Sequence, residues 1–455
     1  MLQLETIAAV ATPPFTAAVG IIRMSGLDCF KIAEEVFFPE DGSSFSDAKP
    51  RVMTYGRLVS DGILMDRVMA VRFPSPNSYT GENSVEIYCH GGTFLLSSAL
   101  GVLVRAGARP AEPGEFTKRA FLNGKTDLSG AEAVSDIIAA DTGNALFNAA
   151  GQLAGRLAGR LKSARDEAVA IAAGFSAWID FIDEGVEPPD TSESVIRLRE
   201  LSNELKSLAD SYTTGRVVKE GVECAIIGRP NVGKSSLLNL LAGFSRSIVT
   251  DIPGTTRDVV EAQVRVGGVM LKLNDTAGIR NTSDLIESLG IKRSRETVGA
   301  SGLVLAVFDG SRELGKEDEL VLDLCRDKTF IAVLNKADLG TLPFEALRLE
   351  APHFVCLSSL TGEGLEELSN MIAALFLKGD MPLDGSVITN SRQADALARA
   401  ANALASAAQT LKSGFTPDIA QIELFAAVDA IGEITGENAS IEVINEIFAR
   451  FCVGK

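Results

Sequence analysis

The feature that most constrains this chain is a short apolar run followed by a glycine-rich loop and a second apolar segment. Residues 224–227 predict a buried strand, residues 228–236 read Gly-Arg-Pro-Asn-Val-Gly-Lys-Ser-Ser, and residues 237–241 predict a helix. The spacing G-x-x-x-x-G-K-S lets backbone N–H groups and the helix N-terminus converge on phosphates. In such a loop Lys234 reaches the β- and γ-phosphates and the Ser235 hydroxyl binds Mg²⁺. The sequence therefore predicts a nucleotide site.

Two further motifs indicate which nucleotide binds. Asn-Lys-Ala-Asp at residues 335–338 follows an apolar run, so we expect it at the carboxyl end of a parallel strand, where open α/β sheets bind ligands. The Asp338 carboxylate can accept both the ring N1–H and the exocyclic amine of guanine, whereas adenine would leave it unpaired. Asp-Thr-Ala-Gly at residues 275–278 fits the element that holds Mg²⁺ through water and senses the γ-phosphate. The order of the three motifs predicts a GTPase domain.

Composition limits the class of protein. A chain of 455 residues suggests roughly three domains. With 46% apolar and 23% charged residues and no long uninterrupted apolar run, we expect a soluble globular protein without a membrane span. The N-terminus lacks the basic stretch of a signal peptide, so export is not expected. Six scattered cysteines and only two histidines predict a reducing cytoplasm and no structural zinc.

The net charge of −17 bears on partners. Nucleic-acid affinity depends largely on Lys and Arg that neutralise phosphates, so this charge argues against tight RNA binding by the chain alone. An RNA partner would need a local basic patch or a basic companion protein.

The pattern along the chain predicts four segments. Residues 1–118 mix short strands with helices, residues 119–218 are helical, residues 219–379 alternate strands and helices as a doubly wound sheet does, and residues 380–455 are helical again. Because helical segments flank a complete α/β domain, we expect that domain to be inserted into a helical one. Two unrelated helical regions are the alternative.

Several motifs outside the nucleotide site carry a family resemblance. They are Ala11-Thr12-Pro13-Pro14, Tyr79-Thr80-Gly81-Glu82-Asn83, His90-Gly91-Gly92, Arg109 to Thr117, Arg119 to Lys125, Gly254-Thr255-Thr256-Arg257-Asp258 and the terminal Phe451-Cys452-Val453-Gly454-Lys455. With these motifs the whole chain resembles the bacterial MnmE (TrmE) family of tRNA-modification GTPases. The GTPase motifs are shared with many relatives, whereas the N-terminal set and the terminal Phe-Cys-Val-Gly-Lys narrow the resemblance to this family.

The resemblance implies a multidomain fold and a specific activity. The expected fold is an α+β tetrahydrofolate-binding and dimerisation domain, an all-α helical domain and an inserted Ras-like α/β P-loop GTPase domain. The expected activity is K⁺-stimulated GTP hydrolysis that drives modification of the wobble uridine, position 34, of certain tRNAs at C5. The product carries an aminomethyl or carboxymethylaminomethyl group, built with a one-carbon unit from 5-formyl- or 5,10-methylene-tetrahydrofolate. The expected assembly is a cytoplasmic homodimer that joins the FAD-carrying flavoprotein MnmG (GidA), as a heterotetramer.

The nucleotide site that follows from motifs and resemblance together is extensive. Its GTP-binding residues are Asn231, Val232, Gly233, Lys234, Ser235, Ser236, Thr250, Asp251, Ile252, Pro253, Gly254, Thr255, Thr256, Asp275, Thr276, Ala277, Gly278, Asn335, Lys336, Ala337, Asp338, Ser358, Ser359 and Leu360. Mg²⁺ is expected at Ser235 and Thr256. The resemblance implies K⁺ at the Asn231 side chain and at backbone oxygens of Thr250, Ile252 and Thr255. A loop residue that bonds its own backbone is the alternative for Asn231.

The residue after the Asp-Thr-Ala-Gly motif is Ile279, where many small GTPases have a glutamine that orients water. An isoleucine cannot bond water, so catalysis must use other groups. Glu287 matches the family's catalytic glutamate. The alternative for Glu287 is a first-turn carboxylate that only complements a helix dipole.

For folate, the resemblance carries over to Arg23, Glu86, Lys125 and Lys455, which could equally be solvated surface charges. Cys452 matches a family cysteine near the folate site, although a lone cysteine is most often a small buried hydrophobe. The rival function is a regulatory GTPase switch of the ribosome-assembly type, which would have no use for a one-carbon carrier.

Overall fold

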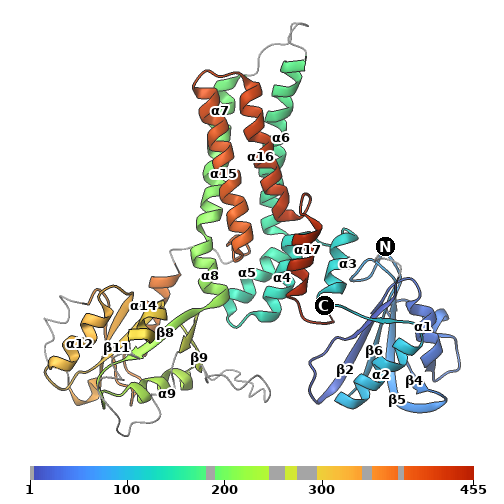
Figure 1. Cartoon of the computed structure of the whole chain (residues 1–455). Helices are drawn as coiled ribbons and strands as arrows, with labels where there is room; N and C mark the ends of the chain where they lie inside the picture. The colour runs from blue at the N-terminus through green and yellow to red at the C-terminus, as the bar shows by residue number, and fades with distance from the viewer. Residues whose placement is uncertain are drawn as a thin grey trace. The chain divides into compact units, whose positions relative to one another are not determined.

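The computed structural model describes residues 5–180, 190–244, 262–273, 295–340, 351–377 and 384–454 (Figure 1). The chain forms two compact units. One comprises Met1–Ser135, Gln152–Ser202 and Arg399–Lys455, and the other comprises Asp136–Gly151 and Asn203–Ala398. The predicted fold class, an α+β domain, a helical domain and a P-loop α/β domain, is confirmed. The predicted domain boundaries stay a prediction.

The N-terminal domain is a seven-stranded sheet in the order β3-β4-β5-β6-β2-β1-β7. Its strands are β1 (Ile7–Val10), β2 (Ala17–Ser25), β3 (Phe37–Pro39), β4 (Thr54–Ser60), β5 (Ile63–Phe73), β6 (Ser84–Gly91) and β7 (Arg109–Pro110). Alternate residues of β4 and β5 are buried, as expected of strands with one covered face. Buried side chains of the sheet pack with those of α1 (Cys29–Val36) and α2 (Thr93–Arg105), which form the domain core.

The helical part of the first unit is built from segments on both sides of the α/β domain. Its helices include α3 (Glu115–Leu122), α4 (Leu128–Ala139), α6 (Arg156–Asp180), α7 (Thr191–Asp210), α15 (Ser391–Lys412), α16 (Pro417–Thr435) and α17 (Ile441–Ala449). α6 and α16 lie side by side (Figure 1), and Gln421 of α16 donates to Ser176 of α6. Ser202 of α7 donates to the carbonyl of Ala401 of α15 over 2.8 Å. The predicted insertion is thereby confirmed.

The C-terminal end packs against the helix that follows the N-terminal sheet. Phe448 of α17 is 1% exposed and lies in a cluster with Leu128 and Phe451. The Gly114 N–H, which precedes α3, donates to the carbonyl of Cys452 over 3.3 Å. Gly114 has φ +67, and a Cβ there would collide with the carbonyl of Phe448. These contacts place the last residues beside the N-terminal domain.

The predicted GTPase domain contains a six-stranded sheet in the order β13-β12-β11-β8-β10-β9. Its strands are β8 (Val222–Ile227), β9 (Ala262–Val266), β10 (Val269–Leu273), β11 (Leu303–Asp309), β12 (Phe330–Asn335) and β13 (Phe354–Cys356), and all neighbours are parallel except β9 and β10. Every residue of β11 and β12 is buried, because helices cover both faces.

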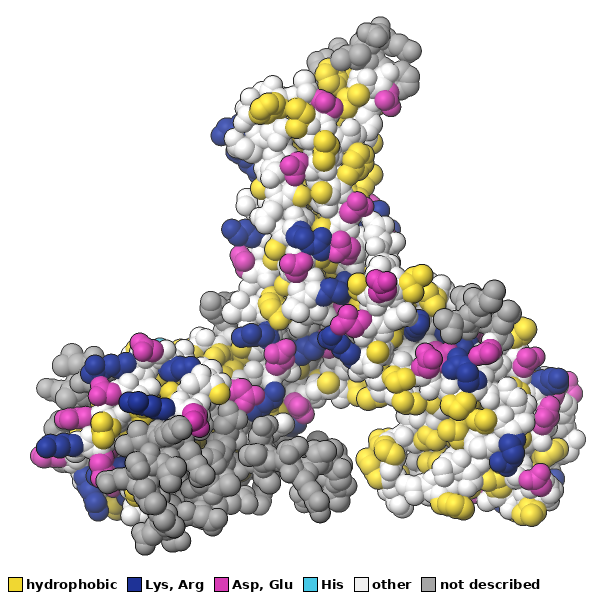
Figure 2. All heavy atoms as spheres, viewed as in Figure 1, with side chains coloured by type: hydrophobic (Ala, Val, Ile, Leu, Met, Phe, Trp, Pro, Cys, Tyr) yellow, Lys and Arg dark blue, Asp and Glu magenta, His cyan; other side chains and the backbone are white. Residues whose placement is uncertain are grey.

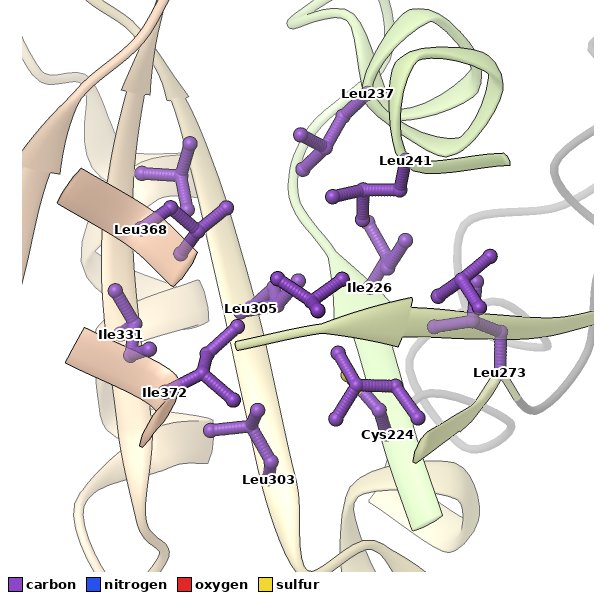
Figure 3. Close-up of a cluster of buried hydrophobic side chains, with 14 of the residues drawn as sticks. Cys224, Ile226, Leu237, Leu241, Leu273, Leu303, Leu305, Ile331, Leu368 and Ile372 are labelled. Carbon is purple, nitrogen blue, oxygen red and sulfur yellow. The ribbon is translucent and has the colours of Figure 1, made fainter. Parts of the chain in front are cut away.

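One of the two covered faces carries the helix that follows the glycine-rich loop. Leu237 and Leu241 of α9 (Lys234–Phe244) point towards Ile226 of β8, and α14 (Leu365–Phe376) packs on the same cluster through Leu368 and Ile372 (Figure 3). The opposite face packs against α12 (Lys316–Cys325). This packing holds the loop between β8 and α9 at the carboxyl edge of the sheet.

The segment that leaves this domain, residues 384–390, is fastened to helices that precede it. Asn148 of α5 (Gly143–Leu153) bonds the backbone of Gly385 and Val387, and Ser211, before α8 (Tyr212–Glu220), accepts from Ile388 N–H. A Cβ at Gly215 of α8 would collide with the carbonyl of Ile388. We call residues 384–390 the exit segment.

α16 lies in residues 380–455, which we predicted as helical, but the sequence analysis gave no separate bounds for this helix. Its N-terminus carries a recognisable signal, because Pro417 occupies the first turn after Thr416 in extended conformation. Among the residues described here, no helix is long and apolar enough to cross a bilayer.

Candidate functional site

The glycine-rich loop has a backbone shape that requires glycine at two places. Gly228 has φ +153 and Gly233 has φ +98. A Cβ at Gly228 would collide with the carbonyl of Val307 on β11, and one at Gly233 would collide with the side-chain amide of Asn335. The loop is therefore pressed against β11 and β12, and its N–H groups are held next to the start of α9.

Lys234, the first residue of α9, closes the loop. Its Nζ donates to the carbonyls of Gly228 and Arg229, each over 2.8 Å, and burial lowers its pKa. Ser235 and Ser236 follow on the exposed side of the first turn. Asn231 is also exposed and adopts a left-handed conformation with φ 63. The glycine-rich loop and the first turn of α9 thus carry the ammonium group of Lys234, the hydroxyls of Ser235 and Ser236 and the side-chain amide of Asn231.

Arg229 ties the loop to a neighbouring helix, a contact that the sequence analysis missed. Its Nε lies 3.2 Å from Asp318 Oδ1, although the two atoms lack the alignment of a hydrogen bond. Asp318 is 1% exposed, and its other oxygen accepts the Gly315 N–H at the start of α12. An acidic residue three positions after a glycine that begins a helix is the signal that could have indicated this carboxylate.

The Asn-Lys-Ala-Asp motif lies next to the loop, at the end of β12. Asn335 is 1% exposed, its Nδ2 donates to the carbonyl of Val232 over 2.8 Å, and its Oδ1 accepts the Ser359 N–H over 2.9 Å. The Ser358 hydroxyl donates to Asp338 Oδ1 over 2.6 Å. The buried side-chain amide of Asn335, at the end of β12, therefore connects the glycine-rich loop to the loop 358–360.

The exposed side of this arrangement is available to a ligand. Asp338 and Leu360 are exposed, and Leu360 is 84% exposed. Ala337 and Lys336 are half-buried between Asn335 and Asp338. A carboxylate that is oriented by Ser358 but open on its other side can accept donors from a base edge.

The rest of the predicted nucleotide site lies outside the described residues. This concerns Thr250, Asp251, Ile252, Pro253, Gly254, Thr255, Thr256, Asp275, Thr276, Ala277, Gly278 and Glu287. The predicted Mg²⁺ contact of Thr256 and the predicted K⁺ contacts of Thr250, Ile252 and Thr255 therefore stay predictions. Within the described ranges no three His, Cys, Asp or Glu side chains gather as a metal site would need.

A second constellation lies on the N-terminal sheet. Arg23 of β2 and Glu86 of β6 are register partners, and both the Nε and one terminal nitrogen of Arg23 contact Glu86 Oε1, at 2.9 and 2.8 Å. The Tyr88 hydroxyl donates to the other Glu86 oxygen over 2.7 Å. Burial and the Glu86 carboxylate raise the pKa of Tyr88 to about 12. The two predicted folate residues therefore form one ion pair on the sheet face away from α1 and α2.

Aromatic rings and a loop surround this pair. The Arg23 guanidinium lies 5.3 Å from the Tyr79 ring centre and 5.8 Å from that of Phe116. Lys125 is exposed, and a Cβ at Gly81 of the same loop as Tyr79 would lie 3.4 Å from the Lys125 side chain. The structure thus brings three of the four predicted folate residues to one loop. Lys455 lies outside the described residues, and Cys452 is exposed.

A buried charge network supports the loop, and the sequence analysis missed it. Arg119, 3% exposed, donates to Glu82 over 3.0 Å and to Glu115 over 2.9 Å, and Arg109 donates to Glu115 over 2.6 Å. Burial acts to raise the pKa of Glu115, but hydrogen bonds from Arg109, the Glu112 N–H and Arg119 outweigh it and leave the pKa below its usual range. Glu82 belongs to the loop that carries Tyr79, so Arg119 fixes that loop to α3.

Two protein-family models match this chain, one over its N-terminal domain and one over the rest. The family model described as the MnmE helical domain matches residues 128–452. The model described as the GTP-binding protein TrmE N-terminus matches residues 6–125. Together these two matches include every element of the nucleotide site and of the Arg23–Glu86 constellation described above.

Proteins that match this chain over its full length belong to the same family. A protein of Thermoanaerobacter sp. (strain X514) is 43% identical over 457 residues, which cover 99% of each chain. One of Clostridioides difficile (strain 630) is 40% identical over 99% of each chain, and one of Roseiflexus sp. (strain RS-1) is 42% identical over 100% of each. All three are named tRNA modification GTPase MnmE, which confirms the prediction of a GTP hydrolase. Because the likeness extends from end to end, this chain belongs to the MnmE family of tRNA modification GTPases.

Proposed function

We propose that this GTPase uses GTP hydrolysis to drive modification of the wobble uridine, position 34, of certain tRNAs at C5. The one-carbon unit for the aminomethyl or carboxymethylaminomethyl group comes from a tetrahydrofolate derivative bound by the N-terminal domain. The flavoprotein MnmG (GidA), which carries FAD, completes the reaction. The observation that carries this proposal is the Arg23–Glu86 pair, a half-buried ion pair on the sheet of the N-terminal domain, which contains none of the GTPase motifs.

The N-terminal constellation fits a pterin. A carboxylate such as Glu86 accepts N–H groups of a planar heterocycle, and a guanidinium such as Arg23 donates to its oxygen or stacks on its ring. Tyr79 and Phe116 already flank Arg23, so a flat ligand would meet aromatic and cationic surfaces together. We propose that Lys125, which is exposed, and Lys455 bind the negatively charged tail of the ligand. Tetrahydrofolate, when bound, supplies the one-carbon unit.

The nucleotide end uses a different set of groups. Lys234 is proposed to bind the β- and γ-phosphates, and the exposed Ser235 hydroxyl is proposed to bind Mg²⁺ together with Thr256. Asp338, oriented by Ser358, accepts the guanine edge. Asn231 holds K⁺, which stabilises charge in the transition state, and Glu287 positions the attacking water. The isoleucine at position 279 supports these last two roles, because it cannot bond water.

Assembly follows from surface and charge. The N-terminal domain exposes hydrophobic side chains around α2 (Figure 2), where Phe94 is 84% exposed, and Tyr55 and Met69 pair on the uncovered sheet face at 46% and 45% exposure. We assign this domain to a homodimer contact. The charge of −17 supports recruitment of tRNA through MnmG, within a cytoplasmic heterotetramer.

Mass analysis of wobble-uridine nucleosides tests the proposal. Cells that lack this chain should lose the C5 modification, and expression of the wild-type chain should restore it. Glu86→Gln should not restore it, whereas Glu40→Gln should, because Glu40 belongs to an exposed ion pair with Arg67 on the same sheet. An unchanged nucleoside profile in the deletion strain refutes the proposal.

A binding measurement tests the folate site independently of GTP hydrolysis and tRNA modification. Calorimetric titration with 5-formyltetrahydrofolate should show binding to the wild type and to Glu40→Gln, and at least about tenfold weaker binding to Glu86→Gln, since one charge-assisted contact contributes that much. Equal affinity in all three proteins removes Glu86 from the folate site.

A further inference from the structure

Asp309, the last residue of β11, is a buried carboxylate to which the proposed mechanism gives no role. It is 4% exposed and is the register partner of Asn335, the first residue of the Asn-Lys-Ala-Asp motif. Its Oδ2 lies 2.7 Å from the Nζ of Lys336, and its Oδ1 accepts the N–H and hydroxyl of Ser311 over 3.1 and 2.6 Å. Arg312 is 3.7 Å from Oδ2 but its side chain is 70% exposed, so Lys336 is the principal cationic partner.

The pair is an ion pair at ordinary pH. Burial acts to raise the pKa of Asp309, but hydrogen bonds from Lys336 and Ser311 outweigh burial and lower the pKa to about 2. The carboxylate is therefore charged near neutral pH. Of the partners that the described residues supply, an Asp309 carboxylate that lost its lysine would keep Ser311 and the exposed Arg312, which makes the Lys336 contact the costly one to remove.

Lys336 is held at both ends. Its backbone has φ 65, a left-handed conformation that is unfavourable for a lysine, and its ammonium group rests on Asp309. On one side of it in the chain, Asn335 binds the phosphate loop at Val232, and on the other, Asp338 is oriented by Ser358. Lys336 therefore lies in the chain between a residue that binds the phosphate loop and the residue proposed to bind the base edge, and its side chain is fixed at both ends.

We propose that Asp309 is a positioning residue for the purine of GTP: by anchoring the Lys336 ammonium it holds the lysine stem as a fixed wall of the base site. The methylene groups of the Lys336 side chain are apolar, and Asp309 neutralises the charge of its ammonium group. Such a side chain can pack against the face of a purine ring while Asp338 accepts hydrogen bonds from the ring's edge. This role rests on the proposed assignment of Asp338 to guanine. Asp309 itself does not touch the nucleotide and acts only through Lys336.

A double-mutant cycle on the full-length protein tests the role. Fluorescent GDP is the probe, and the proteins are wild type, Asp309→Ala, Lys336→Met and the double variant. Each single change should weaken GDP binding about tenfold, and the double variant should be no weaker than Lys336→Met alone, because the carboxylate has nothing left to position. The double variant also removes both charges together, so it avoids an unpaired buried group if Asp309→Ala folds poorly.

Controls distinguish positioning from general destabilisation. Ser311→Ala removes the hydroxyl bond to Asp309 but keeps the backbone N–H bond of residue 311 and the lysine contact, and it should bind GDP as the wild type does. In turnover, Asp309→Ala should raise the KM for GTP by about the factor found for GDP and lower kcat by much less, because the change affects the base end. Additive effects in the cycle, or a Kd within twofold of wild type for Asp309→Ala, overturn the proposal.

The guanine assignment is checked separately. If Asp338→Asn gains no affinity for xanthosine diphosphate, the assignment of Asp338 fails whatever the cycle shows. If Asp338→Asn does gain that affinity and the cycle is additive, only the role of Asp309 fails.

Discussion

Asn148 on α5 makes three hydrogen bonds to the exit segment, and we expect Asn148→Ala to release that segment. Asn148 is 1% exposed. Its Oδ1 accepts the N–H groups of Gly385 and Val387 over 3.2 and 3.3 Å, and its Nδ2 donates to the Val387 carbonyl over 3.0 Å. Alanine would remove these three hydrogen bonds, next to Ile388, which is 0% exposed.

The size of the effect follows from these contacts. A buried hydrogen bond contributes about 1 kcal/mol, so the loss of three costs about 3 kcal/mol. This corresponds to roughly a 150-fold increase in the population of the opened segment. Asn144→Ala on the same helix is the matched control, because Asn144 makes a single 3.3 Å bond to the Gly268 carbonyl at an exposed position. We expect that control to change opening by less than about fivefold.

Hydrogen exchange of the full-length protein measures this directly. Unfolding of a multidomain chain is not two-state, so a global midpoint would not report the local free energy, whereas amide exchange of residues 384–390 does. We expect the Gly385 and Val387 amides to exchange roughly 150-fold faster in Asn148→Ala. The Ile388 amide, which Ser211 accepts over 3.0 Å, shows whether the whole exit segment opens or only its first half. An increase of less than threefold at Gly385 and Val387, or an equal increase in Asn144→Ala, would refute the reasoning.

Four further predictions concern activity and assembly. Asp338→Asn should shift base preference towards xanthine nucleotides, because its amide presents a donor that the 2-oxo group accepts; unchanged GTP affinity with no gain for XTP contradicts the assignment. GTP hydrolysis should be faster in K⁺ than in Na⁺, and Asn231→Ala should remove most of that difference; equal wild-type rates at matched ionic strength count against a K⁺ site. Glu287→Ala should lower kcat by about 10²-fold to 10⁴-fold with nucleotide affinity nearly unchanged, and a loss below about threefold returns Glu287 to a helix-end carboxylate. Residues 1–118 should form a homodimer by light scattering, and a monomer at micromolar concentration argues against a dimer contact in this domain.

The nucleotide-binding elements could be predicted because each is contiguous in the chain. Strand, glycine loop and helix follow one another from residue 224 to residue 241, and the structure has β8 and α9 there. A left-handed or otherwise strained turn needs glycine at particular positions, so the motif itself records the backbone shape at Gly228 and Gly233. The inserted α/β domain was predictable for the same reason, since its strand and helix periods alternate along the sequence.

Some elements carry too weak a local signal. α16 has buried residues around much of its circumference, including Ala427, Val428 and Ala430 in near succession, so its apolar pattern lacks the contrast of an amphipathic helix. β1 and β7 are short: β1 pairs with β2 along all four of its residues, and β7, two residues long, forms the edge of the sheet by parallel pairing with β1. Such strands are decided by their partners.

What the sequence determined alone was the identity and order of the groups that meet a nucleotide, because those groups lie within short motifs. Only the tertiary structure decided which distant groups support them. Asp309 meets Lys336 across adjacent strands, Arg119 joins Glu82 to Glu115, and Asn148 holds a backbone segment far along the chain. No local pattern records these pairs, since hydrogen bonds act over about 3 Å in space and are indifferent to separation along the chain. Their positions follow from how sheets and helices pack.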